Sequence, residues 1–182
     1  MPTRVIPEAW LPATDSVKRV IVHWTAGGYN PSVLDRAHYH VLINGRGEAV
    51  RGLWPIGRYN PPSHVRMLNT GSVGLAICAM AGAQNAHVLG PAPVTRLQWE
   101  RACQAAAEIL YAYGLEVSER TLLCHSEVER VYGQEQRGKW DVDVTPWDPG
   151  KPRGEIHAEM RRKAEWYLAR RMSTSAMHPG SL

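Results

Sequence analysis

The segment that most constrains the fold is residues 18–24 (KRVIVHW), an apolar, β-branched run between Pro12 and the pair Gly27 and Gly28. A short run of this composition, bounded by turn residues, predicts a buried strand. Comparable segments predict four more strands, and the Asn44-Gly45-Arg46-Gly47 turn joins the first two of them as a hairpin. These strands are expected over residues 38–44, 48–52, 72–80 and 120–124.

Two long helices are predicted beside these strands. Thr95 opens the first, because Gln98 completes a capping box and Gly114 is typical of a helix end. The second is expected over residues 156–172, and a short helix over residues 32–36. Apolar residues lie on one stripe of each long helix: Trp99, Ala102, Cys103, Ala106, Ile109, Leu110 and Tyr113 in the first, and Ile156, Met160, Ala164, Tyr167 and Leu168 in the second.

This alternation predicts an α/β fold, with a central mixed β-sheet flanked by helices. The 182 residues are enough for one domain, which we place at residues 1–172, followed by a flexible tail at 173–182. The longest apolar runs are far too short to span a bilayer, and the N-terminus does not have the pattern of a secretory signal. Three cysteines without paired spacing predict buried free thiols rather than disulfides.

The net charge of +4 is a local feature of the C-terminal helix, expected at about 155–172. Residues 151–171 hold seven basic and three acidic residues, so the rest of the chain is neutral overall. A nucleic-acid-binding protein more often carries its basic surface on the main domain, and no nucleic-acid partner is expected. The arginines are either a solvated face or a contact with anionic polymers or lipid headgroups of a cell envelope.

Three residues have the chemistry of a metal centre. His23 ends the first predicted strand, His125 follows the last one, and Asp141 comes 16 residues later. Two imidazoles and a carboxylate are the three protein ligands of a hydrolytic zinc site, although each could also have a purely structural role. Asp143 and Asp148 are alternatives to Asp141 for the third ligand.

The sequence resembles the zinc-dependent N-acetylmuramoyl-L-alanine amidases of the amidase type 2 and peptidoglycan recognition group. The resemblance runs from about residue 20 to residue 141, and the long helix from Thr95 lies in its expected place. Five segments occur in the order of that family: residues 20–25 (VIVHWT), 37–43 (AHYHVLI), 69–76 (NTGSVGLA), 125–128 (HSEV) and 139–141 (KWD).

The resemblance implies a role for each matched position. His23, His125 and Asp141 correspond to the ligands of Zn²⁺, and only Asp141 has a lysine, Lys139, two residues before it. Tyr39 corresponds to the tyrosine that orients or deprotonates the attacking water. The ammonium of Lys139 would stabilise the oxyanion formed at the amide carbonyl.

For the other histidines and for two tryptophans, the sequence leaves more than one role open. Strand alternation would send Tyr39 to the face opposite His38 and His40, which are left out of the metal site. His64 is a candidate substrate-binding residue or an exposed loop histidine, and Trp140 and Trp54 either stack on a sugar or belong to the core or rim. We expect the remaining histidines, His87, His157 and His178, to face solvent.

The function implied is hydrolysis of the bond between the muramic acid lactyl group and L-alanine in bacterial peptidoglycan. The longer spacing between His125 and Lys139, with an insertion at residues 130–138, favours a lytic enzyme like a phage endolysin. Such a protein would be a monomer, made in the cytoplasm, that acts on the cell wall after release or export. The alternatives are a non-catalytic peptidoglycan-binding module, a cytosolic muropeptide-recycling amidase and an exported amidase toxin.

Overall fold

A five-stranded mixed sheet forms the centre of the computed structural model, which describes residues 3–176, with the backbone alone for 172–176. The strand order is β3-β2-β4-β1-β5. β1 runs parallel to β4 and β5, β2 runs parallel to β4, and β3 pairs with β2 as an antiparallel hairpin. The strands are β1 (Arg19–Trp24), β2 (Val41–Ile43), β3 (Ala49–Arg51), β4 (Ser72–Ile77) and β5 (Leu122–Cys124).

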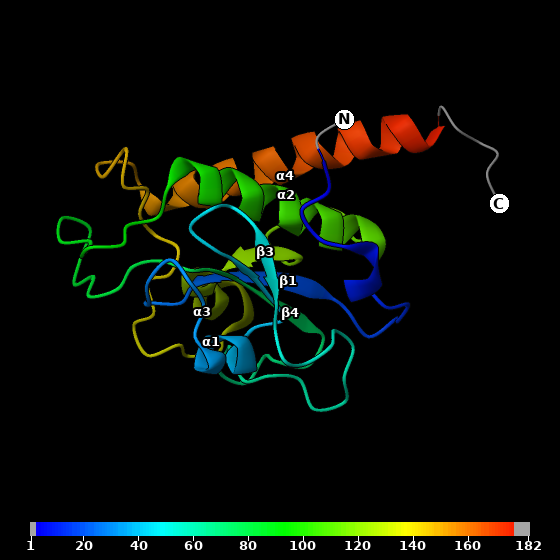
Figure 1. Cartoon of the computed structure of the whole chain (residues 1–182), viewed down its shortest axis with the longest axis horizontal. Helices are drawn as coiled ribbons and strands as arrows, with labels where there is room; N and C mark the ends of the chain where they lie inside the picture. The colour runs from blue at the N-terminus through cyan, green and yellow to red at the C-terminus, as the bar shows by residue number, and fades with distance from the viewer. Residues whose placement is uncertain (1–2, 177–182) are drawn as a thin grey trace.

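Helices lie on both faces of this sheet (Figure 1). Two long helices pack together on one face, and two short helices lie on the other side of the sheet in Figure 1. The long ones are α2 (Arg96–Ala112) and α4 (Arg153–Ala176), the short ones are α1 (Val33–His38) and α3 (Val128–Tyr132), and two 3-10 turns cover Glu8–Trp10 and His125–Glu127. The predicted central mixed sheet flanked by helices is confirmed.

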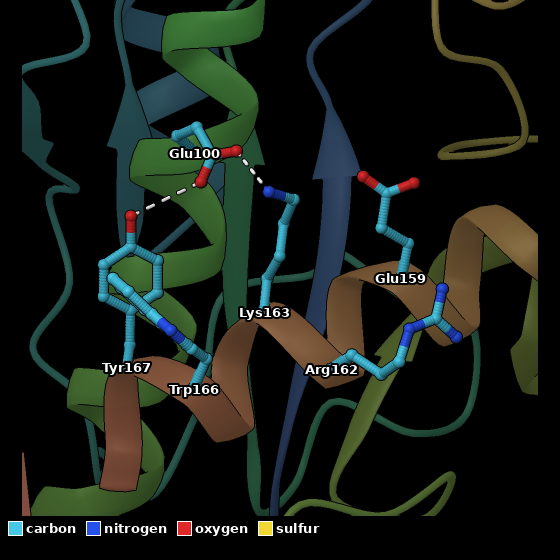
Figure 2. Close-up of a pocket in the computed structure, with 6 residues that line it drawn as sticks. All are labelled: Glu100, Glu159, Arg162, Lys163, Trp166 and Tyr167. Atoms are coloured by element: carbon cyan, nitrogen blue, oxygen red, sulfur yellow. Dashed lines mark hydrogen bonds and ion pairs between the residues drawn. The ribbon is translucent and has the colours of Figure 1, made fainter. Parts of the chain in front are cut away.

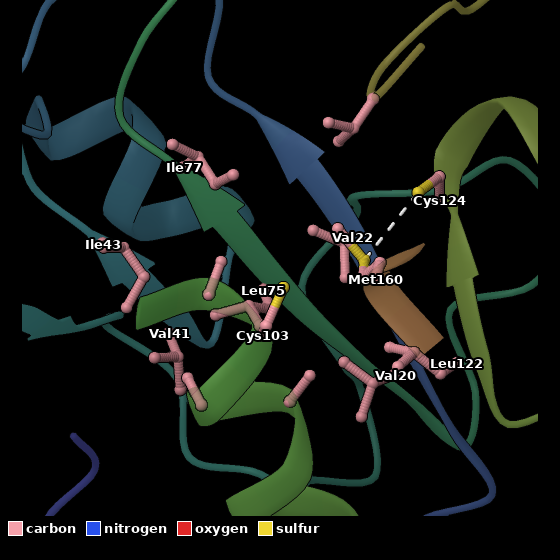
Figure 3. Packing of buried hydrophobic residues seen from close by; sticks show 14 of the residues in the cluster. Val20, Val22, Val41, Ile43, Leu75, Ile77, Cys103, Leu122, Cys124 and Met160 are labelled. Carbon is pink, nitrogen blue, oxygen red and sulfur yellow. Dashed lines mark hydrogen bonds between the residues drawn. The ribbon is translucent and has the colours of Figure 1, made fainter. Parts of the chain in front are cut away.

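The main hydrophobic core lies between the sheet and the two long helices. Val20 and Val22 of β1 point into it, together with Leu75 of β4 and Cys103 of α2 (Figure 3). Ile21, between the two valines, instead belongs to a smaller cluster on the opposite face. All three cysteines are buried and free, as predicted. Among the described residues, no helix is long and apolar enough to cross a membrane.

The predicted capping box of α2 is confirmed. The Thr95 side chain accepts a hydrogen bond from the Gln98 backbone N–H, and the Gln98 side chain accepts one from Thr95 N–H. The helix ends before Gly114, whose φ of +62° suits a residue without a side chain. Every apolar residue of the predicted stripe is buried except Tyr113, which packs partly buried against the core.

Several predicted boundaries differ from the structure. The strand expected over residues 72–80 ends at Ile77, the one expected over 120–124 begins at Leu122, and two further differences involve helices. The second strand begins at Val41 rather than His38, because Ser32 and Asp35 form a capping box that starts α1, and this helix continues to His38. The C-terminal helix extends from Arg153 to Ala176, so residues 173–176 are helical where a tail was expected. The rest of that predicted tail, residues 177–182, lies outside the described residues.

Two long segments without helices or strands surround one edge of the sheet. Residues 52–71 connect β3 to β4, and residues 133–152 connect α3 to α4. The residues with candidate catalytic chemistry lie where these loops meet the ends of β1 and β5.

Candidate metal centre

His23 and His125 are brought together by the pairing of two parallel strands. Val22 of β1 lies opposite Cys124 of β5, so the next residue on each chain is a histidine at the same edge of the sheet. The two imidazole centroids are 4.5 Å apart. Asp141 reaches the pair from the loop of residues 133–152, and all three side chains are buried.

The three side chains converge on one point through single atoms. Nδ1 of His23 lies 3.0 Å from Nδ1 of His125, and Asp141 Oδ2 lies 3.1 Å and 3.0 Å from these two nitrogens. Ligands of a tetrahedral zinc ion with bonds of 2.0–2.1 Å are about 3.3 Å apart. The donor set and its spacing therefore fit zinc with little adjustment.

Gln136 determines which nitrogen of His125 carries the proton. The Gln136 amide nitrogen donates to the carbonyl oxygens of Arg66 and Gln134, at 3.2 Å and 2.8 Å, which fixes the orientation of the amide. Its Oε1 then lies 3.0 Å from His125 Nε2 and accepts the proton of that nitrogen. The His125 Nδ1 lone pair is left free for a metal, in the usual arrangement of a second-layer partner behind a metal-ligating histidine.

His64 lies at Nε2 of His23, as Gln136 lies at Nε2 of His125. His64 Nδ1 lies 3.0 Å from His23 Nε2, so the loop histidine is buried within the candidate site rather than exposed. The ring packs over Gly74, where a Cβ would lie 2.8 Å from His64 Cγ. If His23 binds through Nδ1, its Nε2–H donates to His64, and the His64 proton is then on Nε2. That atom is buried without a hydrogen-bond partner in the described part of the chain.

Burial and contacts within the cluster keep two of the candidate ligands, His23 and Asp141, in their metal-binding protonation states. Burial is the main cause that lowers the pKa of His23 to about 4. Burial alone would raise the pKa of Asp141, but the close contacts of its carboxylate with the imidazoles of His125 and His23 hold it well below its usual range. At neutral pH His23 is thus neutral and Asp141 ionised, as metal ligation requires.

Tyr39 lies beside the cluster as the C-cap of α1, with its ring centroid 5.1 Å from that of His23. Burial, followed by the charge of Asp141, raises the pKa of its phenol, which keeps its proton in the metal-free protein. His38 and His40 are both outside the cluster, although His38 is helical and the alternation expected for it does not apply. His38 Nδ1 lies 2.6 Å from the Ser63 carbonyl oxygen, and His40 Nδ1 accepts from Gly74 N–H.

Lys139 and Trp140 differ in exposure. The Lys139 side chain is exposed, and its positive charge contributes to the lowered pKa of His23. Trp140 is partly buried with its ring centroid 4.8 Å from that of Trp24, so it packs against the core. Trp54 is more exposed, at 38%, and Arg58 stacks over its ring at 4.0 Å.

The competing carboxylates lie outside the group formed by His23, His125 and Asp141. Asp148 is exposed, and Asp143 accepts hydrogen bonds from Ser126 and His157 instead. His157 is buried, which corrects the expectation that it faces solvent. It follows Ile156 directly on the buried side of α4, and this position next to the apolar stripe was the available sequence signal. His87 is exposed as predicted, and His178 lies outside the described residues.

A second buried group lies behind the first one. Cys124, Glu127 and His157 each offer a potential ligand atom within 4.8 Å of the others. Burial would raise the pKa of Glu127, but His157 and Arg161 bind its carboxylate and lower that pKa to about 2. The group therefore already contains its compensating positive charges. Sequence reasoning missed Gln136, because residues 133–150 carry no pattern that distinguishes one polar residue from another. It missed the second group because its members come from β5, the following 3-10 turn and α4.

Comparison with known proteins gives one family and several similar folds. The family model described as N-acetylmuramoyl-L-alanine amidase matches residues 13–151. No curated protein matches the chain significantly. The hydrolase AmiA of Staphylococcus aureus, solved in complex with its ligand, has 12% identity and a TM-score of 0.56, covering 87% of this chain and 76% of that one.

Two further solved structures are similar at lower TM-scores. The Ph2119 endolysin from the Thermus scotoductus MAT2119 bacteriophage has 17% identity and a TM-score of 0.49, covering 84% of this chain and 87% of that one. The endolysin LysCS, an N-acetylmuramoyl-L-alanine amidase from Clostridium intestinale URNW, has 16% identity and a TM-score of 0.47, covering 82% and 93%.

Proposed function

Because this chain belongs to the N-acetylmuramoyl-L-alanine amidase family, we propose that it hydrolyses the amide between the muramic acid lactyl group and L-alanine in peptidoglycan. The proposal includes a zinc ion held by His23, His125 and Asp141. The observation that carries it is the convergence of Nδ1, Nδ1 and Oδ2 of these residues within 3.1 Å of one another, inside the family-matched segment.

The surrounding side chains prepare these three donors. Gln136 and His64 hold the Nε2 protons of His125 and His23, so both Nδ1 lone pairs point to the same place. Zinc bound there would supply Lewis-acid activation of a water molecule at neutral pH.

Tyr39 and Lys139 are the proposed catalytic residues. The Tyr39 hydroxyl keeps its proton in the metal-free protein and can orient the water or the amide carbonyl by a hydrogen bond. The exposed ammonium of Lys139, close enough to lower the pKa of His23, would stabilise negative charge on the carbonyl oxygen. His64, beside His23, and Trp140, at the loop bearing Asp141, are proposed to bind substrate.

The biological role proposed is lysis of the cell wall, as by an endolysin, after the monomer made in the cytoplasm reaches the wall by release or export. A non-catalytic peptidoglycan-binding module is the main alternative, and retention of the complete donor set together with Tyr39 and Lys139 argues against it. A muropeptide-recycling amidase is a second alternative. It is distinguished by its activity on soluble fragments but not on intact sacculi.

The proposal is tested by incubating purified sacculi with the protein and measuring new L-alanine amino groups together with bound metal. We expect about one zinc per chain, and activity that a chelator removes and zinc restores. Asp141→Ala should lose zinc and activity, while Asp148→Ala, at an exposed competing carboxylate, should keep both. Release of reducing sugar without new amino termini would mean a glycosidase and would overturn the proposal.

A further inference from the structure

Helix α4 begins at Arg153, just beyond the family-matched residues 13–151, and packs against both α2 and β5. Its apolar residues, among them Ile156, Met160 and Ala164, belong to the main core. The same helix also presents His157 and Arg161, one turn apart, to the segments that carry two of the candidate metal ligands. These two polar residues are not needed to complete an apolar interface.

His157 contacts both ligand-bearing segments with one imidazole ring. Its Nε2 lies 2.9 Å from Oδ1 of Asp143, which is two residues after Asp141. Its Nδ1 lies 3.5 Å from Oε1 of Glu127, which is two residues after His125. The His157 side chain is only 6% exposed, and those of Glu127 and Asp143 are 2% and 12% exposed. The contact is therefore shielded from water. A charged interaction is stronger in such a buried place than in solvent.

Arg161 holds the His125 segment from the next turn of α4. Its Nη1 lies 3.1 Å and 3.0 Å from the two carboxylate oxygens of Glu127, and 3.2 Å from the carbonyl oxygen of Leu122 in β5. The Glu127 carboxylate in turn accepts a hydrogen bond from the Cys124 backbone N–H at 3.0 Å. Arg161 thus binds the chain just before and just after His125.

The direct links between the two ligand segments are few. Ser126 N–H donates to the Asp141 carbonyl oxygen at 2.8 Å, and the Ser126 hydroxyl donates to Asp143. Asp141 itself lies in a loop with no helix or strand to hold it. Because a zinc site tolerates only small errors in ligand position, this loop needs further support.

We propose that His157 and Arg161 of α4 are positioning residues of the metal centre, clamping the His125 and Asp141 segments in the arrangement that brings their donor atoms together. This inference rests on the metal site of the proposed function. It assigns the C-terminal helix a role in metal affinity besides covering the sheet. A residue that only anchored α4 would lower the stability of the protein without a specific effect on metal affinity.

The experiment measures the zinc dissociation constant of the full-length protein by competition with a chromogenic chelator, and the melting temperature of the zinc-free protein. His157→Leu removes the imidazole contacts with Asp143 and Glu127, and we expect zinc to bind about 10-fold more weakly, the low end of the range for a partner that touches a ligand directly. His157→Gln, which can still donate a hydrogen bond to Asp143, should recover part of that loss. Arg161→Met should also weaken zinc binding.

Two control variants separate positioning from stability. Lys163→Met breaks the ion pair that joins α4 to Glu100 of α2, away from the ligand segments (Figure 2). Ile109→Ala opens a cavity in the main core and lowers the melting temperature. Both should bind zinc as the wild type does.

Three results would contradict the positioning role of His157 and Arg161, the proposed function, or both. Wild-type zinc affinity in His157→Leu would overturn the positioning role while leaving the proposed function intact. An equal loss of zinc affinity in Ile109→Ala would likewise overturn it, because the effect would then follow stability alone. Failure of the wild-type protein to bind zinc would instead overturn the proposed function, and the inference with it.

Discussion

Two aspartates only two positions apart have different partners in this protein. Asp141 meets the imidazoles of His23 and His125, whereas Asp143 accepts from Ser126 and His157. Val142 between them is fully buried and belongs to the main core. The neighbouring carboxylates therefore differ in role, one as a proposed metal ligand and the other as an anchor of the same loop.

At the residue scale, Lys139→Ala tests the proposed oxyanion contact. Lys139 is exposed and is not one of the three converging donors, so the variant should bind zinc normally. Loss of one charged partner of the transition state should lower the turnover number by ~10²-fold. Single-turnover hydrolysis of a defined muropeptide and metal analysis are the measurements. Loss of zinc together with activity would contradict this assignment.

A second residue-scale prediction concerns His40 and the acid sensitivity of the zinc-free protein. Burial lowers the pKa of His40 to about 4, while the unfolded chain takes up a proton at this histidine near pH 6.5. The contribution of His40 to stability is therefore fully present above about pH 6.5 and is lost as pH falls towards 4.

His40→Asn should reduce this acid dependence, because Asn can accept the Gly74 N–H hydrogen bond without titrating. The slope of unfolding free energy against pH should decrease by up to about 1.4 kcal/mol per pH unit between pH 4.5 and 6. Urea unfolding across that range, with His87→Asn at an exposed histidine as the control, measures it. An unchanged slope would show that His40 does not titrate as described.

At the element scale, capping boxes determine where helices begin. In α1 the box between Ser32 and Asp35 starts a helix that continues through His38, although the β-branched pattern after it favoured an earlier strand. In α2 the box between Thr95 and Gln98 starts the long helix that covers the main core. The first helix was predicted over residues 32–36, and only its end was misplaced, because the residues up to His38 were assigned to the next strand. The second helix was predicted correctly from its box.

Thr95→Ala should lower the unfolding free energy by about 1 kcal/mol, because it removes the acceptor of the Gln98 N–H bond. Thr95→Asn, which can still cap the helix, should remain near the wild type. Zinc affinity should not change in either variant, since α2 packs on the face of the sheet opposite to His23. Denaturant unfolding and chelator competition test both statements, and a change in zinc affinity would argue against independent roles.

At the scale of the whole molecule, the arginines of the basic C-terminal helix are of two kinds, some bound inside the protein and some exposed to solvent. Arg161 is 13% exposed and bound to Glu127, so it is not available to an external partner. Arg162 and Arg170 are exposed, and Arg170 stacks over Trp166 at 3.8 Å. The proposed contact with anionic envelope polymers or lipid headgroups therefore has to use the exposed arginines.

A variant with both Arg162→Gln and Arg170→Gln should bind sacculi less than the wild type at low salt. Binding of the wild type should weaken steeply towards physiological salt, because each exposed charge near an anionic surface contributes only ~1 kcal/mol and is screened. Hydrolysis of a small soluble muropeptide should stay normal. Co-sedimentation with sacculi over a salt series measures the binding. Equal binding of the variant and the wild type would show that these arginines only face solvent and do not contribute to binding.

The sequence by itself determined the features that depend on neighbouring residues. Buried strands, the capping box of α2 and the turn of the hairpin were readable because their signals lie within a few residues. The metal-ligand candidates His23, His125 and Asp141, with Tyr39 and Lys139, came from residue chemistry at strand ends and from family resemblance. Their roles stay predictions.

Only the tertiary structure decided which polar groups meet. His23 contacts His125 and Asp141 across 102 and 118 residues of sequence, and Gln136 and His157 complete their surroundings from a patternless loop and a helix face. Such contacts depend on strand pairing and on how each loop crosses the sheet. No local propensity encodes them, because the energy that selects them comes from burial and hydrogen bonding between segments distant in the chain.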